Sequence, residues 1–75
     1  MSRLPALRPR EVLRALGRAG FRVHHHMGGH AYLHHPQDPA LHVSVPIHPG
    51  DVKRGTLRAI LRQAGLSEEE FIRLL

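Results

Sequence analysis

Two short alternating segments joined by a pair of glycines most constrain the fold of this chain. Apolar and polar side chains alternate in residues 21–27 and 30–35, and Gly28-Gly29 separates the two segments. Alternation is typical of a strand with one buried face, and a two-residue glycine loop is typical of a tight hairpin. The sequence therefore predicts an antiparallel hairpin.

A third strand is expected at about residues 41–45, after a turn at residues 36–39. Val43 and the apolar residues at alternate positions, including Ile47, are expected to point into the core. Pro46 has no N–H to donate to a sheet, so it marks the end or the edge of this strand.

Apolar residues at helical spacing precede the strands. Pro9 suits the first turn of a helix, and Val12 and Leu16 belong to a stripe that predicts a helix over about residues 9–19. Residues 1–8 are expected to form a loose lead-in.

The same spacing predicts a helix at about residues 55–64, and the capping-box pattern of Ser67 and Glu70 predicts a last short helix. The fold class is therefore α+β, in the order α-β-β-β-α(-α). The simplest packing is a three-stranded antiparallel sheet with the helices on one face, as in double-stranded-RNA-binding domains. The length allows one domain, residues 1–75.

Composition narrows the function classes. The net charge of +5 suits a polyanionic partner such as RNA or DNA, although a merely solvated surface explains the charge as well. The absence of cysteine excludes disulfides and thiolate metal sites. No apolar run is long enough for a membrane span or a signal peptide, so we expect a cytoplasmic protein with no membrane partner.

Histidines are concentrated on the predicted strands. Strict alternation assigns Phe21, Val23 and His25 to the core face. It assigns seven other residues to the open face: Arg22, His24, His26, His30, Tyr32, His34 and His42. Such a cluster is unusual for core packing.

Three interpretations of this face stay open. It is a polar surface without chemistry, or a metal site built on His24 and His26, or an RNA-cleaving site. No carboxylate lies near the two histidines to orient them, so no metal or other cofactor is expected.

RNA cleavage needs a base that takes the proton of a ribose 2′-hydroxyl, and a positive charge beside the phosphate. His30 is the best-placed base because it follows the flexible Gly28-Gly29 turn, where a substrate backbone can come close. The candidate phosphate contacts are Arg22, Lys53, Arg54 and Arg58.

Several motifs together resemble the HicA family of toxins, the mRNA interferases of HicA–HicB toxin–antitoxin pairs. These motifs are Gly28-Gly29-His30 with Tyr32-Leu33 and His35-Pro36, the stretch Val43-Ser44-Val45-Pro46-Ile47-His48, and the long block from Gly55 to Ser67. The resemblance covers nearly the whole chain and makes residues 1–75 a single HicA-like domain.

The resemblance implies a metal-independent endoribonuclease with His30 as the catalytic residue. It also implies a HicB-type antitoxin that covers the active face, with DNA contacted only through the antitoxin. Gly29 departs from the family, which commonly has serine there. His48 matches the family motif in a loop, where a turn-stabilising role is an equal alternative. Tyr32 is a candidate for stacking on a base.

Two hypotheses without chemistry remain beside this one. The first is a module that binds double-stranded RNA by its shape alone. The second is a protein that acts only by binding another protein through its open face and acidic end.

Overall fold

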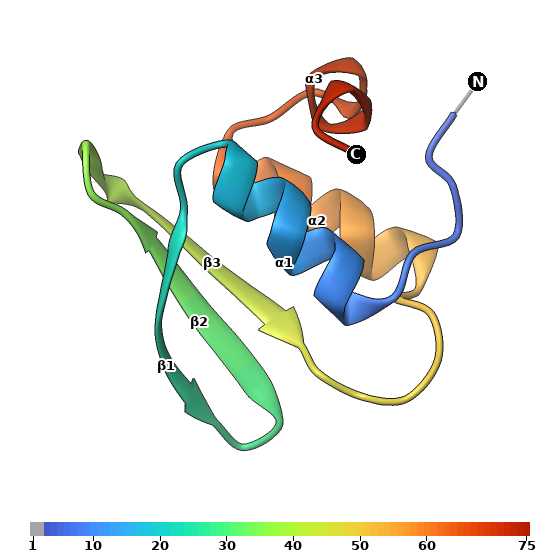
Figure 1. Cartoon of the computed structure of the whole chain (residues 1–75), viewed down its shortest axis with the longest axis horizontal. Helices are drawn as coiled ribbons and strands as arrows, with labels where there is room; N and C mark the ends of the chain where they lie inside the picture. The colour runs from blue at the N-terminus through green and yellow to red at the C-terminus, as the bar shows by residue number, and fades with distance from the viewer. Residues whose placement is uncertain (1–2) are drawn as a thin grey trace.

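The computed structural model describes residues 3–75, and its elements follow the predicted order (Figure 1). The elements are α1 (Pro9–Arg18), β1 (Arg22–Met27), β2 (His30–His35), β3 (Asp38–Pro46), α2 (Arg54–Ala64) and α3 (Glu68–Arg73). The strands form one antiparallel sheet in the order β1-β2-β3. The predicted α+β class is confirmed.

The helix ends follow from local chemistry. The backbone N–H of Arg8 donates to the Glu11 carboxylate at 2.9 Å at the start of α1. Helix α2 ends at Gly65, whose φ of 71° lies in the left-handed region that favours glycine. The predicted capping box of α3 is confirmed, because Ser67 and Glu70 exchange two hydrogen bonds of 2.8 and 3.0 Å.

A single apolar core lies between the sheet and the helices. Its most deeply buried side chains include Leu16 of α1, Leu33 of β2, Leu57 of α2 and Phe71 of α3. Figure 1 shows α1 and α2 side by side on the sheet, with α3 beyond one end of the pair. None of the helices within residues 3–75 has the length and apolar character needed to cross a bilayer.

Residues 3–8 pack against the rest of the domain, so the expectation of a loose N-terminal segment is wrong for them. Leu4 and Leu7 are buried in the core. The backbone N–H of Val52 donates to the Leu7 carbonyl at 2.7 Å, which fastens this segment to the loop before α2. The first two residues of the predicted lead-in lie outside the described part of the chain.

Strand β3 begins earlier than expected. It starts at Asp38, within the segment predicted as a turn, and a register irregularity occurs where His35 pairs with Asp38. It ends at Pro46, as predicted. Ile47 is 39% exposed, so its predicted core position is wrong. Its N–H bonds to the Gly29 carbonyl instead.

A β-bulge in β1 reverses part of the predicted face assignment. Val23 pairs with Leu33, but His25 rather than His24 pairs with Tyr32, so His24 is the extra residue. His25 therefore shares the open face with Tyr32, against the prediction. His26 pairs with buried Ala31 and turns to the helix side, which is also the opposite of the prediction.

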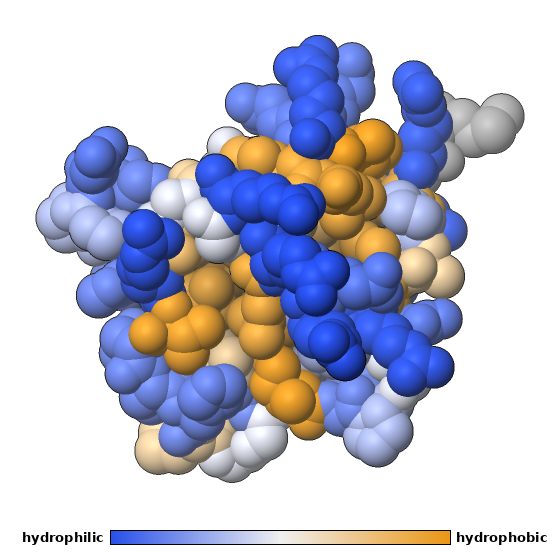
Figure 2. Space-filling view, viewed as in Figure 1, coloured by the Kyte–Doolittle hydropathy of each residue, from blue (hydrophilic) through white to orange (hydrophobic). Residues whose placement is uncertain are grey.

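Strand β1 extends beyond the cover of the helices. Val23 lies on the helix-side face as predicted, yet it is 43% exposed. Figure 2 shows apolar side chains at the surface between β1 and α1. The helices pack mainly against β3, which leaves β1 at the uncovered edge of the sheet (Figure 1).

Candidate active site

His30 lies at the point where the hairpin turn becomes β2. Gly28 and Gly29 both have positive φ, 59° and 78°, as a tight turn of this kind requires. The Nδ1 atom of His30 lies 3.3 Å from the Gly28 carbonyl oxygen. Since a carbonyl only accepts, this contact favours the tautomer with its proton on Nδ1, in which Nε2 has the lone pair.

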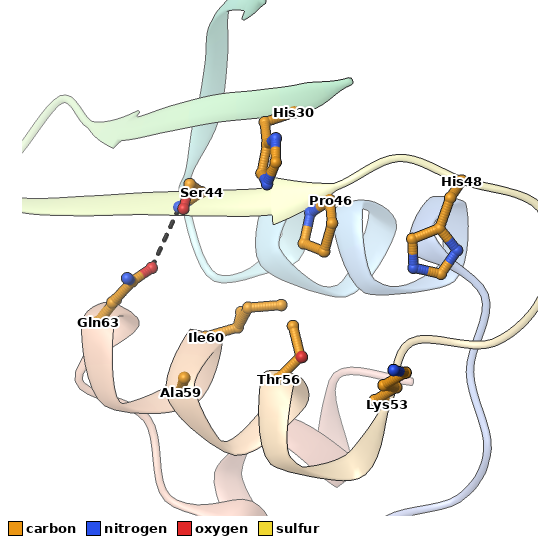
Figure 3. A pocket seen from close by; sticks show the side chains of 9 residues that line it. All are labelled: His30, Ser44, Pro46, His48, Lys53, Thr56, Ala59, Ile60 and Gln63. Carbon is orange, nitrogen blue, oxygen red and sulfur yellow. Dashed lines mark hydrogen bonds between the residues drawn. The ribbon is translucent and has the colours of Figure 1, made fainter. Parts of the chain in front are cut away.

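The ring of His30 borders a cavity of about 480 Å³ between the sheet and α2, which we call the His30 cavity (Figure 3). Nine side chains line it: His30, Ser44, Pro46, His48, Lys53, Thr56, Ala59, Ile60 and Gln63. In Figure 3, α1 lies behind the sheet and His30 is on the near side, which is the open face.

Helix α2 forms the second wall because it is fastened to the edge of the sheet. The side-chain oxygen of Gln63 accepts a hydrogen bond from the backbone N–H of Ser44 at 3.1 Å. Thr56, Ile60 and Gln63 lie three to four residues apart, so they share one side of the helix. That side faces β3 and the His30 cavity.

His48 and Lys53 line the far side of the cavity. His48 Nδ1 lies 2.9 Å from the carbonyl oxygen of Pro49, so its Nε2 is the atom left for a ligand. Lys53 is exposed and directly precedes α2. The cavity therefore combines two imidazoles with a primary ammonium, an arrangement suited to a phosphate group.

Three of the sequence-predicted residues, His30, His48 and Lys53, meet in this cavity. His24 and Tyr32 instead line a neighbouring cavity on the open face. Gly28 and Gly29 form the turn beside His30 without lining either cavity.

The predicted arginines are not in the cavity lining. Arg22 pairs with His34, four residues along β2 from His30, or roughly 13 Å. Arg58 forms an ion pair with Glu68 at 3.5 Å on another side of α2. Arg54 is exposed in the first turn of α2 and lines neither cavity.

Sequence reasoning missed Ser44, Thr56 and Gln63 as site residues. Ser44 had the open-face parity of its strand, which was a usable signal. The other two depend on how α2 is placed against β3, which no local pattern reveals. Ser44 and Thr56 bring hydroxyls to the cavity in a chain that has Gly29 in place of the serine expected from the HicA resemblance.

Neighbouring rings alter the acid–base behaviour of His24. Loss of water around the charged ring lowers its pKa, and positive charge on His25, His34 and His42 lowers it further. The neutral form is therefore favoured. Among residues 3–75, no three histidine or carboxylate side chains are grouped so as to hold a metal ion.

The fold and the cavity define a small α+β domain of the double-stranded-RNA-binding type, with a basic cavity bearing histidines beside one sheet edge. The family model described as the HicA toxin of bacterial toxin–antitoxin systems matches residues 9–66, and the chain belongs to this family. The family is in general one of RNA-cleaving toxins. Because these toxins belong to toxin–antitoxin systems, a cognate antitoxin is the partner that membership implies. A search of curated proteins finds no match.

Proposed function

We propose that this chain is an mRNA interferase, a metal-independent endoribonuclease with His30 as its general base. The observation that carries the proposal is the His30 cavity, which brings His30, His48 and Lys53 to one opening. Family membership supports the toxin role, and the cavity supplies the groups that phosphodiester cleavage needs.

The reaction follows from the free nitrogen of His30. Nε2 takes the proton of a ribose 2′-hydroxyl, and the 2′-oxygen attacks the adjacent phosphorus. The bond from phosphorus to the 5′-oxygen then breaks, and that oxygen takes up a proton. The products are a 2′,3′-cyclic phosphate and a 5′-hydroxyl end, so no metal or further reactant is needed.

The other cavity residues have separate tasks in this scheme. Lys53 neutralises charge that develops on the phosphate oxygens. His48, when protonated on both nitrogens, donates the proton that the leaving 5′-oxygen requires. The Ser44 and Thr56 hydroxyls are candidates for hydrogen bonds to the phosphate.

A HicB-type antitoxin is the expected protein partner, and we propose that it covers the open face and so closes the His30 cavity. The cytoplasm is the expected location, because the proposed mRNA substrate is found there. DNA contact is expected only through the antitoxin.

A double-stranded-RNA-binding module without chemistry is the second candidate. One observation favours it: Arg10, Arg14 and Arg18 are exposed on α1, away from the open face, and dark blue side chains run across α1 in Figure 2. Duplex RNA bound there without being cut, in a gel-shift assay, supports this role. If the protein binds no RNA at low salt, the RNA-binding module is excluded.

Growth after induction tests the proposed toxin role. Wild type is expected to arrest growth, and His30→Ala is expected not to. His26→Ala is the matched control, because His26 is an exposed histidine of the same hairpin on the other face. Arrest by His30→Ala at equal protein level contradicts the assignment, and rescue by a neighbouring antitoxin gene supports it.

A further inference from the structure

A second cavity adjoins the His30 cavity on the open face. It has a volume of about 250 Å³, room for one nucleobase, and we call it the Tyr32 cavity. Seven residues line it: His24, Tyr32, Leu33, His42, Val43, Ser44 and Gln63. Ser44 and Gln63 line both cavities, so a ligand chain can pass directly from one to the other.

Tyr32 presents a flat ring to this cavity. His25 stacks on the β1 side of the ring, with centroids 4.7 Å apart and planes 14° apart. On the β3 side the paired residue is Ser44, which is too small to cover the ring. One side of Tyr32 is therefore supported by a neighbour, and the side turned to the cavity is left for a ligand.

Further rings extend this surface in both directions. The His24 ring stacks on His34 with centroids 5.2 Å apart, and it meets His25 edge to face at 4.3 Å. At the other end, the ring centroid of His30 lies 6.1 Å from that of Tyr32. The proposed catalytic ring and the Tyr32 cavity are thus immediate neighbours.

We propose that the Tyr32 cavity is a nucleobase subsite, which holds one unpaired base of single-stranded RNA beside the phosphate bound in the His30 cavity. This inference rests on the proposed function for its neighbouring phosphate, and it adds the class of RNA and the residue that recognises it. The base stacks on the free side of Tyr32.

Single-stranded RNA fits this surface better than a duplex does. Bases in a duplex stack on one another, whereas unpaired bases are free to stack on an aromatic side chain. Neither cavity lining contains an aspartate or glutamate that would repel the RNA backbone. Lys53 and the net charge of +5 favour a polyanion.

The protonation behaviour of the rings supports the same ligand. The pKa of His24 is lowered by loss of water and by charge on His25, His34 and His42. Arg22 and Tyr32 are further charged or titratable side chains on neighbouring strand positions. A neutral His24 avoids repulsion within the row of rings and leaves its faces available for packing.

Tyr32 itself reports binding, because the chain has one tyrosine and no tryptophan. The test uses the full chain with His30→Ala, which keeps the RNA uncut, and titrates it with a short oligouridylate single strand. Stacking is expected to quench the tyrosine fluorescence in a saturable manner. The same strand annealed to oligoadenylate is expected to quench it much less.

Affinities of labelled RNA for variants in the same background complete the test. Tyr32→Ala is expected to weaken single-strand binding by roughly 5- to 100-fold, the range for one stacked base. Tyr32→Phe is expected to retain binding, because stacking needs the ring and not the hydroxyl. His26→Ala is the matched control. If Tyr32→Ala does not fold, the quenching and the Tyr32→Phe result still decide.

Two results overturn the subsite. One is the absence of quenching at saturating single strand, and the other is an equal loss for single strand and duplex in Tyr32→Ala. If Tyr32→Ala loses only antitoxin binding, the cavity is a protein-docking surface and the proposal is wrong. Wild type that cleaves RNA while Tyr32→Ala binds normally contradicts the subsite alone. Wild type that never cleaves, but shows the quenching, contradicts the proposed function alone.

Discussion

The side-chain oxygen of Gln63 accepts a hydrogen bond from the backbone N–H of Ser44, with an N···O distance of 3.1 Å. This bond fastens α2 to β3, the edge strand of the sheet. We expect Gln63→Ala to lower the free energy of unfolding by about 1 kcal/mol, the usual net value of one hydrogen bond. The rate of RNA cleavage is expected to fall by more than the loss of folded protein explains, because α2 carries one wall of the His30 cavity.

Urea unfolding and cleavage assays on the same samples measure both effects. The matched control is Gln37→Ala, since Gln37 is exposed in the turn between β2 and β3. Equal stability and equal cleavage for Gln63→Ala and wild type contradict the role of this contact.

Two glycines near the end of α1 are expected to respond in opposite directions to alanine. At Gly20 the φ is 102°, and a Cβ there would lie 2.6 Å from Nε2 of His35. That nitrogen lies 3.1 Å from the Ala19 carbonyl oxygen, and the ring meets Phe21 edge to face. Gly20→Ala therefore strains the backbone and displaces a fixed ring, and we expect a loss of about 1–3 kcal/mol.

Gly17→Ala is the counterpart on the same helix. A Cβ at Gly17 meets nothing within 4 Å, and the residue is helical. Alanine is expected to stabilise the protein by roughly 0.5–1 kcal/mol through its helix propensity. Thermal unfolding of both variants measures the two signs, and stabilisation by Gly20→Ala would rule out the packing described for His35.

The capping box of α3 makes part of the stability sensitive to acid. Hydrogen bonds from the backbone and the side chain of Ser67 lower the pKa of Glu70 below its ordinary value of 4.5. The unfolded chain then binds a proton more readily than the folded one. The contribution of Glu70 is therefore complete above about pH 4.5 and is lost as the pH falls through the lower folded value.

Glu70→Gln is expected to be less stable than wild type at neutral pH, and the difference is expected to vanish in acid. Urea unfolding across this pH range measures it. Glu69→Gln serves as control because Glu69 is exposed in the same turn of α3. A difference that is constant with pH refutes the capping account.

His48 is expected to act on the leaving group. His48→Ala is expected to slow cleavage of ordinary RNA by about 100-fold or more, the usual range for a general acid. Replacing the 5′-bridging oxygen with sulfur should restore most of the rate, because a thiolate leaves without protonation. If the variant is equally slow on both substrates, His48 has a binding or structural role instead.

Local patterns predicted the elements but not their exceptions. The alternation and the Gly28-Gly29 turn identified the hairpin, because strand and turn preferences act over a few residues. The bulge at His24 has no such signal, so strict alternation predicts the wrong faces for His25 and His26. Burial of Leu4 is likewise a tertiary effect.

The sequence predicts some residues of the candidate site but not others. His30 followed from its place after the turn and from the HicA resemblance, and both agree with its position in the cavity. Thr56 and Gln63 enter the site only because α2 lies along β3. Arg22 shares the open face with His30, but parity says nothing of distance along a strand, and Arg22 lies near the far end.

The most direct test of the account is cleavage of mRNA by purified protein in the presence of a chelator. Wild type and His26→Ala are expected to cleave it and to leave 2′,3′-cyclic phosphate ends, whereas folded His30→Ala is expected to be inactive. Cleavage by His30→Ala at the wild-type rate, or cleavage by wild type that stops when metal is removed, would contradict the account.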